Sequence, residues 1–363
     1  NREAKDDAIF FDEIKPDTLC FDESHTLKNL NVESKDNGFN SDGSQRAQDA
    51  YSKISWLYRQ HGADQNLIMA SGTPISNTFA EGFTLMRYAM PERFEAMMGG
   101  QPHFDRFASI FIKPETTIEI GVDGHYKERS RYSIVNIPEL MGAMDFMDVR
   151  YADDLGIERP DIKRTILTTP ANEVQEVFRL EIAQRAEAIK NRSVEPDEDN
   201  YLKLASDGRK AALDIRLLDP ELPDFPDSKI NTVIGEIVKR YEQSSDVLGT
   251  QAVFCDQGVP GGASFDLYND MKTKLINQGI PADQIAFAHD ANNDAQREQL
   301  FERINRGEIR VIIGSTEKMG TGTNMQERMV ALYHLDAPSN MRPSGVEQRE
   351  GRIIRQGNIN KEA

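Results

Sequence analysis

The segment Leu19–His25, with the sequence LCFDESH, is an apolar run that ends in two adjacent carboxylates. At the end of a strand, Asp22 could hold Mg²⁺ through water, and Glu23 could orient or polarise a water molecule that attacks a phosphate. Both are therefore candidate catalytic residues and candidate metal ligands. Adjacent acidic residues also occur at strand ends as solvated caps, and this segment alone does not exclude that interpretation.

A second polar segment, Ser71-Gly72-Thr73-Pro74, follows the next apolar run along the chain. The hydroxyl groups of Ser71 and Thr73 could hydrogen-bond to the carboxylate loop and relay its state to a neighbouring element. The alternative is a Gly-Pro turn that merely leaves the sheet, and for this string in isolation the alternative is favoured.

A third segment, Ser315–Asn324 with the sequence STEKMGTGTN, is rich in glycine and hydroxyl groups and follows the apolar run RVIIG. Backbone N–H groups and side-chain donors in such a loop can bind phosphate oxygens. The loop lacks the G-x-x-x-x-G-K-[ST] pattern of a nucleotide P-loop, so a contact to a nucleic-acid backbone fits it better. A plain surface loop is the alternative. The candidate DNA-binding residues are Ser315, Thr316, Lys318, Thr321, Gly322 and Thr323.

A fourth segment, EQREGRIIRQG at 347–357, combines glutamine and arginine at helical spacing. If the helix is continuous, Gln348, Arg352 and Arg355 fall at i, i+4 and i+7 on one face. Guanidinium groups on such a face could neutralise the oxygens of a transferred phosphate as arginine fingers, so all three are candidate catalytic residues. The alternative is a solvated basic face paired with Glu347 and Glu350.

The boundaries of this fourth helix follow from its terminal residues. Ser344 and Glu347 have the spacing of a capping box, and Gly357 can end a helix. Because Arg349 would project from a different part of the helix, it is expected to contribute little.

Apolar runs alternate with helical segments at both ends of the chain, which indicates parallel sheets with helices on their faces. In the first part, strands are expected at 18–22 and 66–70, with a helix at 44–59 behind a Ser44 cap. In the last part, strands are expected at 251–255, 285–288, 310–314 and 330–335, and helices at 264–277, 294–305 and 344–354. Between Pro91 and Pro226 the clearest signal is one long helix at 173–191.

The composition is that of an ordinary globular protein: 363 residues, a formal charge of −17 and 38% hydrophobic residues, which excludes collagen, coiled-coil and low-complexity classes. No apolar run approaches the ~18 residues that a membrane span requires, so no membrane partner is expected. Cys20 and Cys255 are both expected in buried strands, which excludes a disulfide scaffold and favours a reducing compartment. From His289 to Ala363 the basic and acidic residues balance, 11 of each, so this part would tolerate an anion best.

Taken together, DESH, SGTP, STEKMGTGTN and QREGRIIRQG resemble motifs II, III, V and VI of the superfamily 2 helicase core, and VFCDQ at Val253–Gln257 resembles motif IV. SGTPISN and the R-x-x-R-Q-G ending look like the Swi/Snf branch, whose members are ATP-driven double-stranded DNA translocases. GRKAALDIRLLDPELPDFPDSKIN (Gly208–Asn231), GTQAVFCD and STEKMGTGTNMQERMVALYHLDAP are similar to the helicase section of large phage- and plasmid-borne N6-adenine methyltransferase–helicase proteins.

The resemblance implies an α/β fold with two RecA-like lobes, the first truncated at its amino end, joined by a mostly helical insertion or connector. The expected parts are 1–92 with motifs II and III, 93–227 as the connector, and 228–363 with motifs IV, V and VI. It implies ATP and Mg²⁺ as cofactors, double-stranded DNA as partner, and the cytoplasm of a bacterial or phage-infected cell as location. His25 would couple the hydrolysis site to the other motifs, and Arg352 and Arg355 would act across the interlobe cleft.

The chain also departs from the family pattern. Ser24 stands where Ala or Gly is usual. After Asp336-Ala337-Pro338 the family tends to continue with an aromatic residue and Arg-Pro, whereas here the run is SNMRP at Ser339–Pro343. No G-x-x-x-x-G-K-[ST] occurs, and only 21 residues precede Asp22, whereas a P-loop lies on the order of a hundred residues before the Asp-Glu box. We therefore expect the P-loop, and a possible DNA methyltransferase, on an upstream segment of the same polypeptide, and no ATP hydrolysis by this chain alone. A non-catalytic DNA- or protein-binding module that keeps the helicase fold is the alternative.

Overall fold

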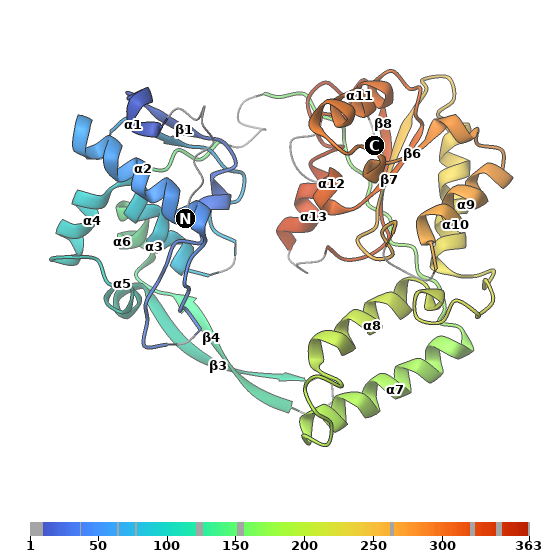
Figure 1. Ribbon diagram of the computed structural model, residues 1–363, viewed down its shortest axis with the longest axis horizontal. Coiled ribbons are helices and arrows are strands. Elements are labelled where there is room, and N and C mark those ends of the chain that lie inside the picture. The colour runs from blue at the N-terminus through green and yellow to red at the C-terminus, as the bar shows by residue number, and fades with distance from the viewer. Residues whose placement is uncertain are drawn as a thin grey trace. The chain divides into compact units, whose positions relative to one another are not determined.

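The computed structural model describes residues 10–36, 38–63, 65–76, 78–120, 126–150, 156–261, 265–319, 324–338 and 343–361 (Figure 1). The chain divides into two compact units. Unit 1 comprises Asn1–Ile120 and Tyr126–Arg150, and unit 2 comprises Gly121–His125 and Tyr151–Ala363. The predicted boundaries at 92/93 and 227/228 stay predictions.

The sheet of unit 1 consists of two parallel strands, β1 (Leu19–Phe21) and β2 (Leu67–Met69), with Leu19 opposite Leu67. Helix α2 (Gln45–His61) connects them and begins at Ser44, whose side chain accepts a hydrogen bond from the N–H of Ala47, so both strands and this helix are confirmed. One face of the sheet packs against a core of α2 and its neighbours. The prediction for Cys20 was wrong: it is exposed, because it alternates onto the opposite face together with Ile68, which is 58% exposed.

The remainder of unit 1 is an aromatic core between short helices. The helical elements are α1 (Phe11–Ile14), η1 (Ser24–Leu27), α3 (Ala80–Ala89), α4 (Pro91–Met98), α5 (Phe104–Phe111) and α6 (Ile137–Ala143). Phe83, Phe94, Phe104 and Phe107 are all buried, with ring centroids 5.4 to 6.2 Å apart. These contacts fix α3, whose first turn carries the buried Glu81 discussed below.

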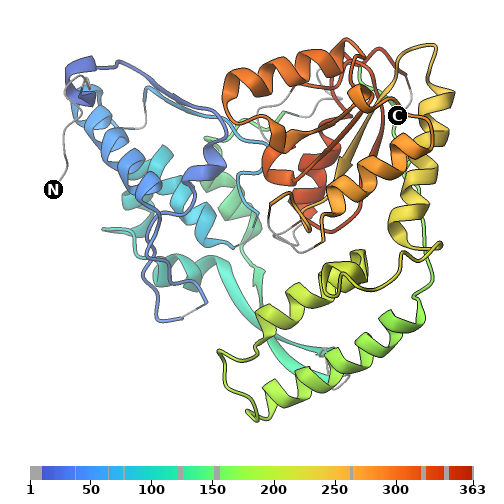
Figure 2. The same cartoon turned by 45° about the vertical axis from the view of Figure 1, so that its right-hand side comes forward.

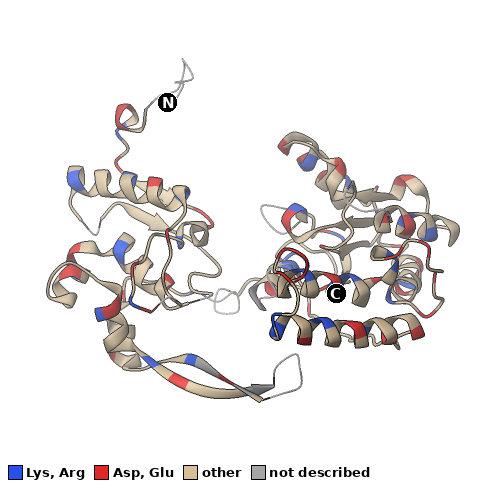
Figure 3. Cartoon of the chain, turned by 60° about the horizontal axis from the view of Figure 1, so that its bottom comes forward, with Lys and Arg blue, Asp and Glu red and all other residues tan. Residues whose placement is uncertain are grey.

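An antiparallel ribbon of two strands, β3 (Ile112–Ile120) and β4 (Tyr126–Ile134), follows α5. The ribbon stands alone as a two-stranded sheet, and charged residues of both signs lie along it (Figure 3). A mostly helical insertion was predicted here, and the sequence pattern did not reveal these two strands.

The sheet of unit 2 has four parallel strands in the order β6-β7-β5-β8. The strands are β5 (Thr250–Phe254), β6 (Ile285–Phe287), β7 (Val311–Gly314) and β8 (Met329–His334), and each confirms a predicted strand. All four therefore end at one edge of the sheet. This parallel sheet and the surrounding helices make the chain a mixed α/β protein, in accordance with the predicted class.

Both faces of this sheet are covered, as a parallel sheet requires. Val253 and Cys255 pack with one core cluster, whereas Ala252 and Phe254 pack with the other. Helices α9 and α10 lie on one side and α11, α12 and α13 on the other (Figure 1). Their bounds are α9 (Lys229–Gln243), α10 (Leu267–Asn277), α11 (Asp294–Asn305), α12 (Thr316–Met319) and α13 (Pro343–Glu350), with short turns η3 (Ala282–Gln284) and η4 (Ala288–Asp290).

A helical hairpin of α7 (Glu173–Lys190) and α8 (Tyr201–Leu213) precedes this sheet, and its helices run side by side (Figure 2). Arg185 on α7 pairs with Asp199 at 2.7 Å and with Asp207 at 3.0 Å. A turn, η2 (Ile215–Leu217), then carries the buried Arg216, which pairs with Asp214 at 2.7 Å. Among the described residues, no helix is long and apolar enough to cross a membrane.

Candidate functional site

In unit 1, the carboxyl ends of β1 and β2 bring the first two polar segments to the same sheet edge. The N–H of Ser24 donates to the carbonyl of Ala70 at 2.9 Å, which joins the two loops directly. Asp22 accepts from the N–H of Glu23 at 2.8 Å. Glu23 has φ of 49°, a left-handed conformation that is uncommon for residues other than glycine.

His25 connects the acidic pair to the second segment. Its Nδ1 lies 3.1 Å from Oε2 of Glu23 and 3.3 Å from Oγ of Ser71. The same Ser71 oxygen accepts from the N–H of Thr73 at 3.1 Å. The predicted coupling residues His25, Ser71 and Thr73 therefore form one chain of contacts with Glu23. Which atoms donate and which accept in the contacts of His25 depends on the tautomer of the imidazole.

The acidic pair fits Mg²⁺ only as part of a nucleotide site. Asp22 and Glu23 are both exposed and offer hard oxygen ligands. Among the described residues, no group of three His, Cys, Asp or Glu side chains is placed to hold a metal ion. Protein sites of this kind bind Mg²⁺ through one or two carboxylates together with substrate phosphates, so two carboxylates are sufficient here.

A second interaction links the loops that follow β1 and β2, and it was not identified from the sequence. Nζ of Lys28 lies 3.2 Å from Oε1 of Glu81 and also donates to Oγ of Ser76. The other oxygen of Glu81 accepts from the N–H of Ser76 at 2.6 Å. Because the Glu81 side chain is only 8% exposed, this acid is a structural part of the loop, and its place in the first turn of a largely apolar helix was the available signal.

In unit 2, the carboxyl ends of three strands meet around one arginine. Asp256 follows β5, Thr316 follows β7 and Asp336 follows β8. Nη2 of Arg349 lies 3.1 Å from Oδ2 of Asp256 and 3.3 Å from Oδ1 of Asp336, while its Nε donates to Oγ1 of Thr316 at 2.8 Å. In open α/β sheets, ligands bind outside the carboxyl ends of the strands, which is the edge that this cluster supports.

Arg349 is not a surface residue, since its side chain is 0% exposed; its expected small contribution to catalysis stays a prediction. The predicted helix at 344–354 was too long: α13 ends at Glu350, and tighter turns follow it. The early end brings Ile353 into the core of the sheet, where it is 4% exposed. Gln348, Arg352 and Arg355 therefore do not share one continuous helical face.

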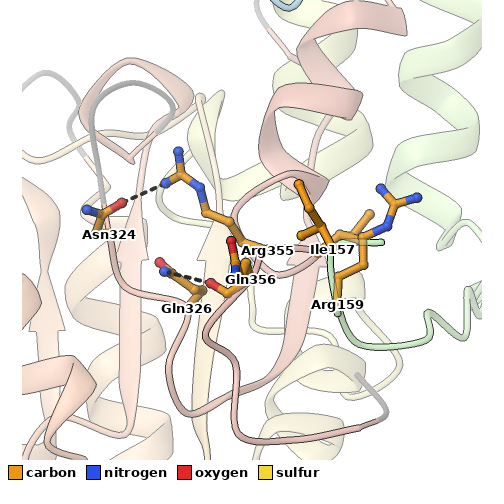
Figure 4. A pocket seen from close by; sticks show the side chains of 7 residues that line it. Ile157, Arg159, Asn324, Gln326, Arg355 and Gln356 are labelled. Atoms are coloured by element: carbon orange, nitrogen blue, oxygen red, sulfur yellow. Dashed lines mark hydrogen bonds between the residues drawn. The ribbon is translucent and has the colours of Figure 1, made fainter. Parts of the chain in front are cut away.

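The three residues of the predicted stripe have different environments. Gln348 is half-buried, and Arg352 is 8% exposed. Arg355 donates from Nη1 to Oδ1 of Asn324 at 2.8 Å and lines a cavity of about 400 Å³ (Figure 4). Figure 4 also shows that the Arg159 side chain, which lines the same cavity, is directed away from Arg355. Arg355 lines this cavity, whereas Gln348 and Arg352 do not.

In the third segment, the first two hydroxyl groups face inward. Oγ of Ser315 lies 3.4 Å from Nε2 of His289, and Thr316 donates to Asp256 from both its N–H and its hydroxyl. Lys318 is the cation of this segment and is half-buried. The other predicted DNA-binding residues, Thr321, Gly322 and Thr323, lie outside the described residues.

Burial shifts the pKa of two groups at the carboxyl edge of this sheet, Asp336 and His289. It raises the pKa of Asp336, although the N–H groups of Gln257 and Asp256 donate to that carboxylate at 2.8 and 2.7 Å and act in the opposite direction. Burial, followed by the charge of Lys318, lowers the pKa of His289. Asp290 and Glu317 act in the opposite direction on His289, so charges of both signs lie near the third segment.

Comparison with known families gives matches at both ends of the chain. Residues 1–151 match the model of a probable helicase domain, and residues 264–357 match the helicase conserved C-terminal domain. These matches support a helicase superfamily. The human lymphoid-specific helicase is 22% identical over 231 residues, which are 63% of this chain and 23% of that protein, so the chain spans less than a quarter of that relative.

The matched regions contain the polar segments of this helicase-like chain. The first includes β1, β2 and the contacts of Glu23, His25 and Ser71. The second includes β6, β7, β8 and Arg349, whereas β5 and Asp256 precede it. The family likeness thus extends over both sheet edges at which the candidate residues gather.

Proposed function

We propose that the chain is part of an ATP-dependent DNA translocase or helicase core of the Swi/Snf type. The observation that carries the proposal is the contact chain from Glu23 through His25 to Ser71, which joins an acidic pair to the loop of the next strand. A solvated acidic cap needs no such partner, whereas a hydrolysis site must pass its state to other elements.

In this proposal, Asp22 holds Mg²⁺ together with ATP, and the bound metal neutralises charge on the phosphates. Glu23 orients the attacking water, and His25 transmits the state of Glu23 to Ser71 and Thr73. Arg352 and Arg355 supply positive charge to the transferred phosphate, and Gln348 is the third catalytic residue of this segment.

The partner in this proposal is double-stranded DNA, bound through its phosphates by the segment that begins at Ser315. One cation, Lys318, and hydroxyl or backbone donors position the backbone without reading bases. The chain carries no G-x-x-x-x-G-K-[ST] pattern, so we propose that the loop for the β- and γ-phosphates belongs to an upstream segment of the same polypeptide. A methyltransferase on that polypeptide is part of the same proposal.

Phosphate release from MgATP tests the proposed function. We expect duplex DNA to stimulate release by a polypeptide that contains this chain and the phosphate-binding loop, and no release by residues 1–363 alone. Equal release with and without duplex DNA would contradict the proposal and favour a helicase-like fold with another role.

A further inference from the structure

The cluster around Arg349 is closed off from solvent. The side chains of Arg349, Asp256 and Asp336 are 0%, 5% and 6% exposed. Besides its two carboxylate partners and Thr316, Arg349 donates from Nη1 to the carbonyl of Asp336 at 2.7 Å, and its guanidinium carbon lies 5.2 Å from the ring centre of Phe254. The guanidinium group is therefore held on every side by atoms from β5, β7 and β8 or the residues that follow them.

Asp256 and Arg349 together fix the first residue of α12. Asp256 Oδ1 accepts from the N–H of Thr316 at 2.6 Å and from its hydroxyl at 2.9 Å, while Oδ2 faces Arg349. The Thr316 hydroxyl in turn accepts from Nε of Arg349. Thr316 therefore cannot move relative to α13 without breaking contacts to both charged groups.

Burying such a charged cluster in a core carries a large desolvation free energy. Desolvation of one arginine and two carboxylates costs more than apolar side chains of the same volume would, so stability alone does not account for it. What the charged cluster provides is a fixed geometry, because the planar fork of arginine accepts few orientations. The element whose position it fixes is the segment Ser315–Met319, with Lys318 in α12.

We propose that Arg349, with Asp256, is a positioning residue for phosphate binding: it holds Thr316, and with it Lys318, where a DNA phosphate is bound. This inference rests on the proposed function of the Ser315–Met319 segment. In this proposal α13 does more than carry Gln348. It is also coupled to the DNA-binding segment, because the guanidinium group of Arg349 transmits any movement of α13 to that segment.

The test is fluorescence anisotropy of a labelled duplex titrated with the whole chain carrying Asp256→Asn. Asparagine keeps an oxygen for Thr316 but removes the negative charge that faces Arg349. The matched control is Asp214→Asn, because Asp214 is also a buried carboxylate of unit 2, 4% exposed and 2.7 Å from Arg216. Both variants are expected to lower the melting temperature, so affinities are measured at a temperature where circular dichroism shows both folded.

We expect Asp256→Asn to raise the Kd for two unrelated duplexes by about tenfold, the order of one charge-assisted hydrogen bond, and Asp214→Asn to leave it within twofold of wild type. Equal weakening by both variants, or by neither, would overturn the positioning role. If Asp256→Asn does not fold, Arg349→Lys replaces it with the same expected result, because lysine cannot contact Thr316 and both carboxylates at once.

Two further outcomes separate this inference from the proposed function. If wild type does not bind duplex DNA, the proposed function of the segment fails and the positioning role fails with it. If wild type binds, Lys318→Ala weakens binding and Asp256→Asn does not, only the positioning role fails.

Discussion

The ion pair between Lys28 and Glu81 gives the most specific prediction about unit 1. The side chains are 15% and 8% exposed, and Nζ of Lys28 lies 3.2 Å from Oε1 of Glu81. Lys28→Met keeps most of the volume but removes the cation beside a buried carboxylate. Breaking a buried pair in this way costs about 3 to 5 kcal/mol of unfolding free energy, because the remaining carboxylate is left buried without a compensating charge. The double variant Lys28→Met/Glu81→Gln should cost less than Lys28→Met alone, since no buried charge then remains at this position.

The assay is urea unfolding followed by tryptophan fluorescence. The chain has a single tryptophan, Trp56, which lies on α2 in unit 1 and therefore reports the unit that contains the pair. Lys53→Met is the control, because Lys53 and Asp49 form an exposed i,i+4 pair on the same helix. That variant should change stability by less than about 0.5 kcal/mol. A Lys28→Met variant as stable as Lys53→Met, or a double variant that costs the sum of its two single changes, would refute the reasoning.

Three further outcomes follow from individual contacts. Hydrogen bonds from Arg164 hold the pKa of Glu350 below its usual 4.5, so this contact stabilises the chain above pH 4.5 and is lost as the pH falls through the lowered value. The melting temperature of Arg164→Ala should therefore lie below that of wild type at pH 7 and approach it in acid; a constant difference would contradict this. Arg355→Ala should lower DNA-stimulated phosphate release by ~10³-fold or more with little change in melting temperature, whereas Arg352→Ala should lower both, since Arg352 is 8% exposed. Identical melting temperatures for these two variants would be the contrary result. Tyr88→Phe should cost about 1 to 3 kcal/mol in urea unfolding, because the buried hydroxyl lies within hydrogen-bond distance of two carbonyl oxygens; no change would refute this.

The elements that local patterns determine could be predicted from the sequence. The four strands of unit 2 are short apolar runs, and each lies in the sheet near its expected bounds. Helix α2 begins where Ser44 offers a side-chain acceptor to a free helix N–H. The contact of His25 with Ser71 follows from parallel pairing of β1 and β2, since both loops must leave the same sheet edge.

The elements that depend on distant residues could not be predicted in this way. A helical wheel treats Arg349 as a surface charge, but its burial depends on Asp256 and Asp336, which only the fold brings to it. Helix α13 ends at Glu350, well before Gly357, and Ile353 in the turns that follow is buried in the core of the sheet. Strand β3 contains Pro114, which argues against a strand in a sheet interior but is compatible with a ribbon in which both strands are edges.

We propose that the acidic pair at β1 performs hydrolysis while the Ser315–Met319 segment binds DNA, and Glu23→Gln separates these two roles. The measurement is DNA-stimulated phosphate release, paired with duplex affinity by anisotropy, in a polypeptide that joins this chain to a phosphate-binding loop. Glu33→Gln, at an exposed acid of the same unit, is the control. We expect Glu23→Gln to abolish release at every DNA concentration and to leave duplex affinity within twofold of wild type, while Glu33→Gln changes neither. Full release by Glu23→Gln, or a loss of DNA binding that parallels the loss of release, would contradict it.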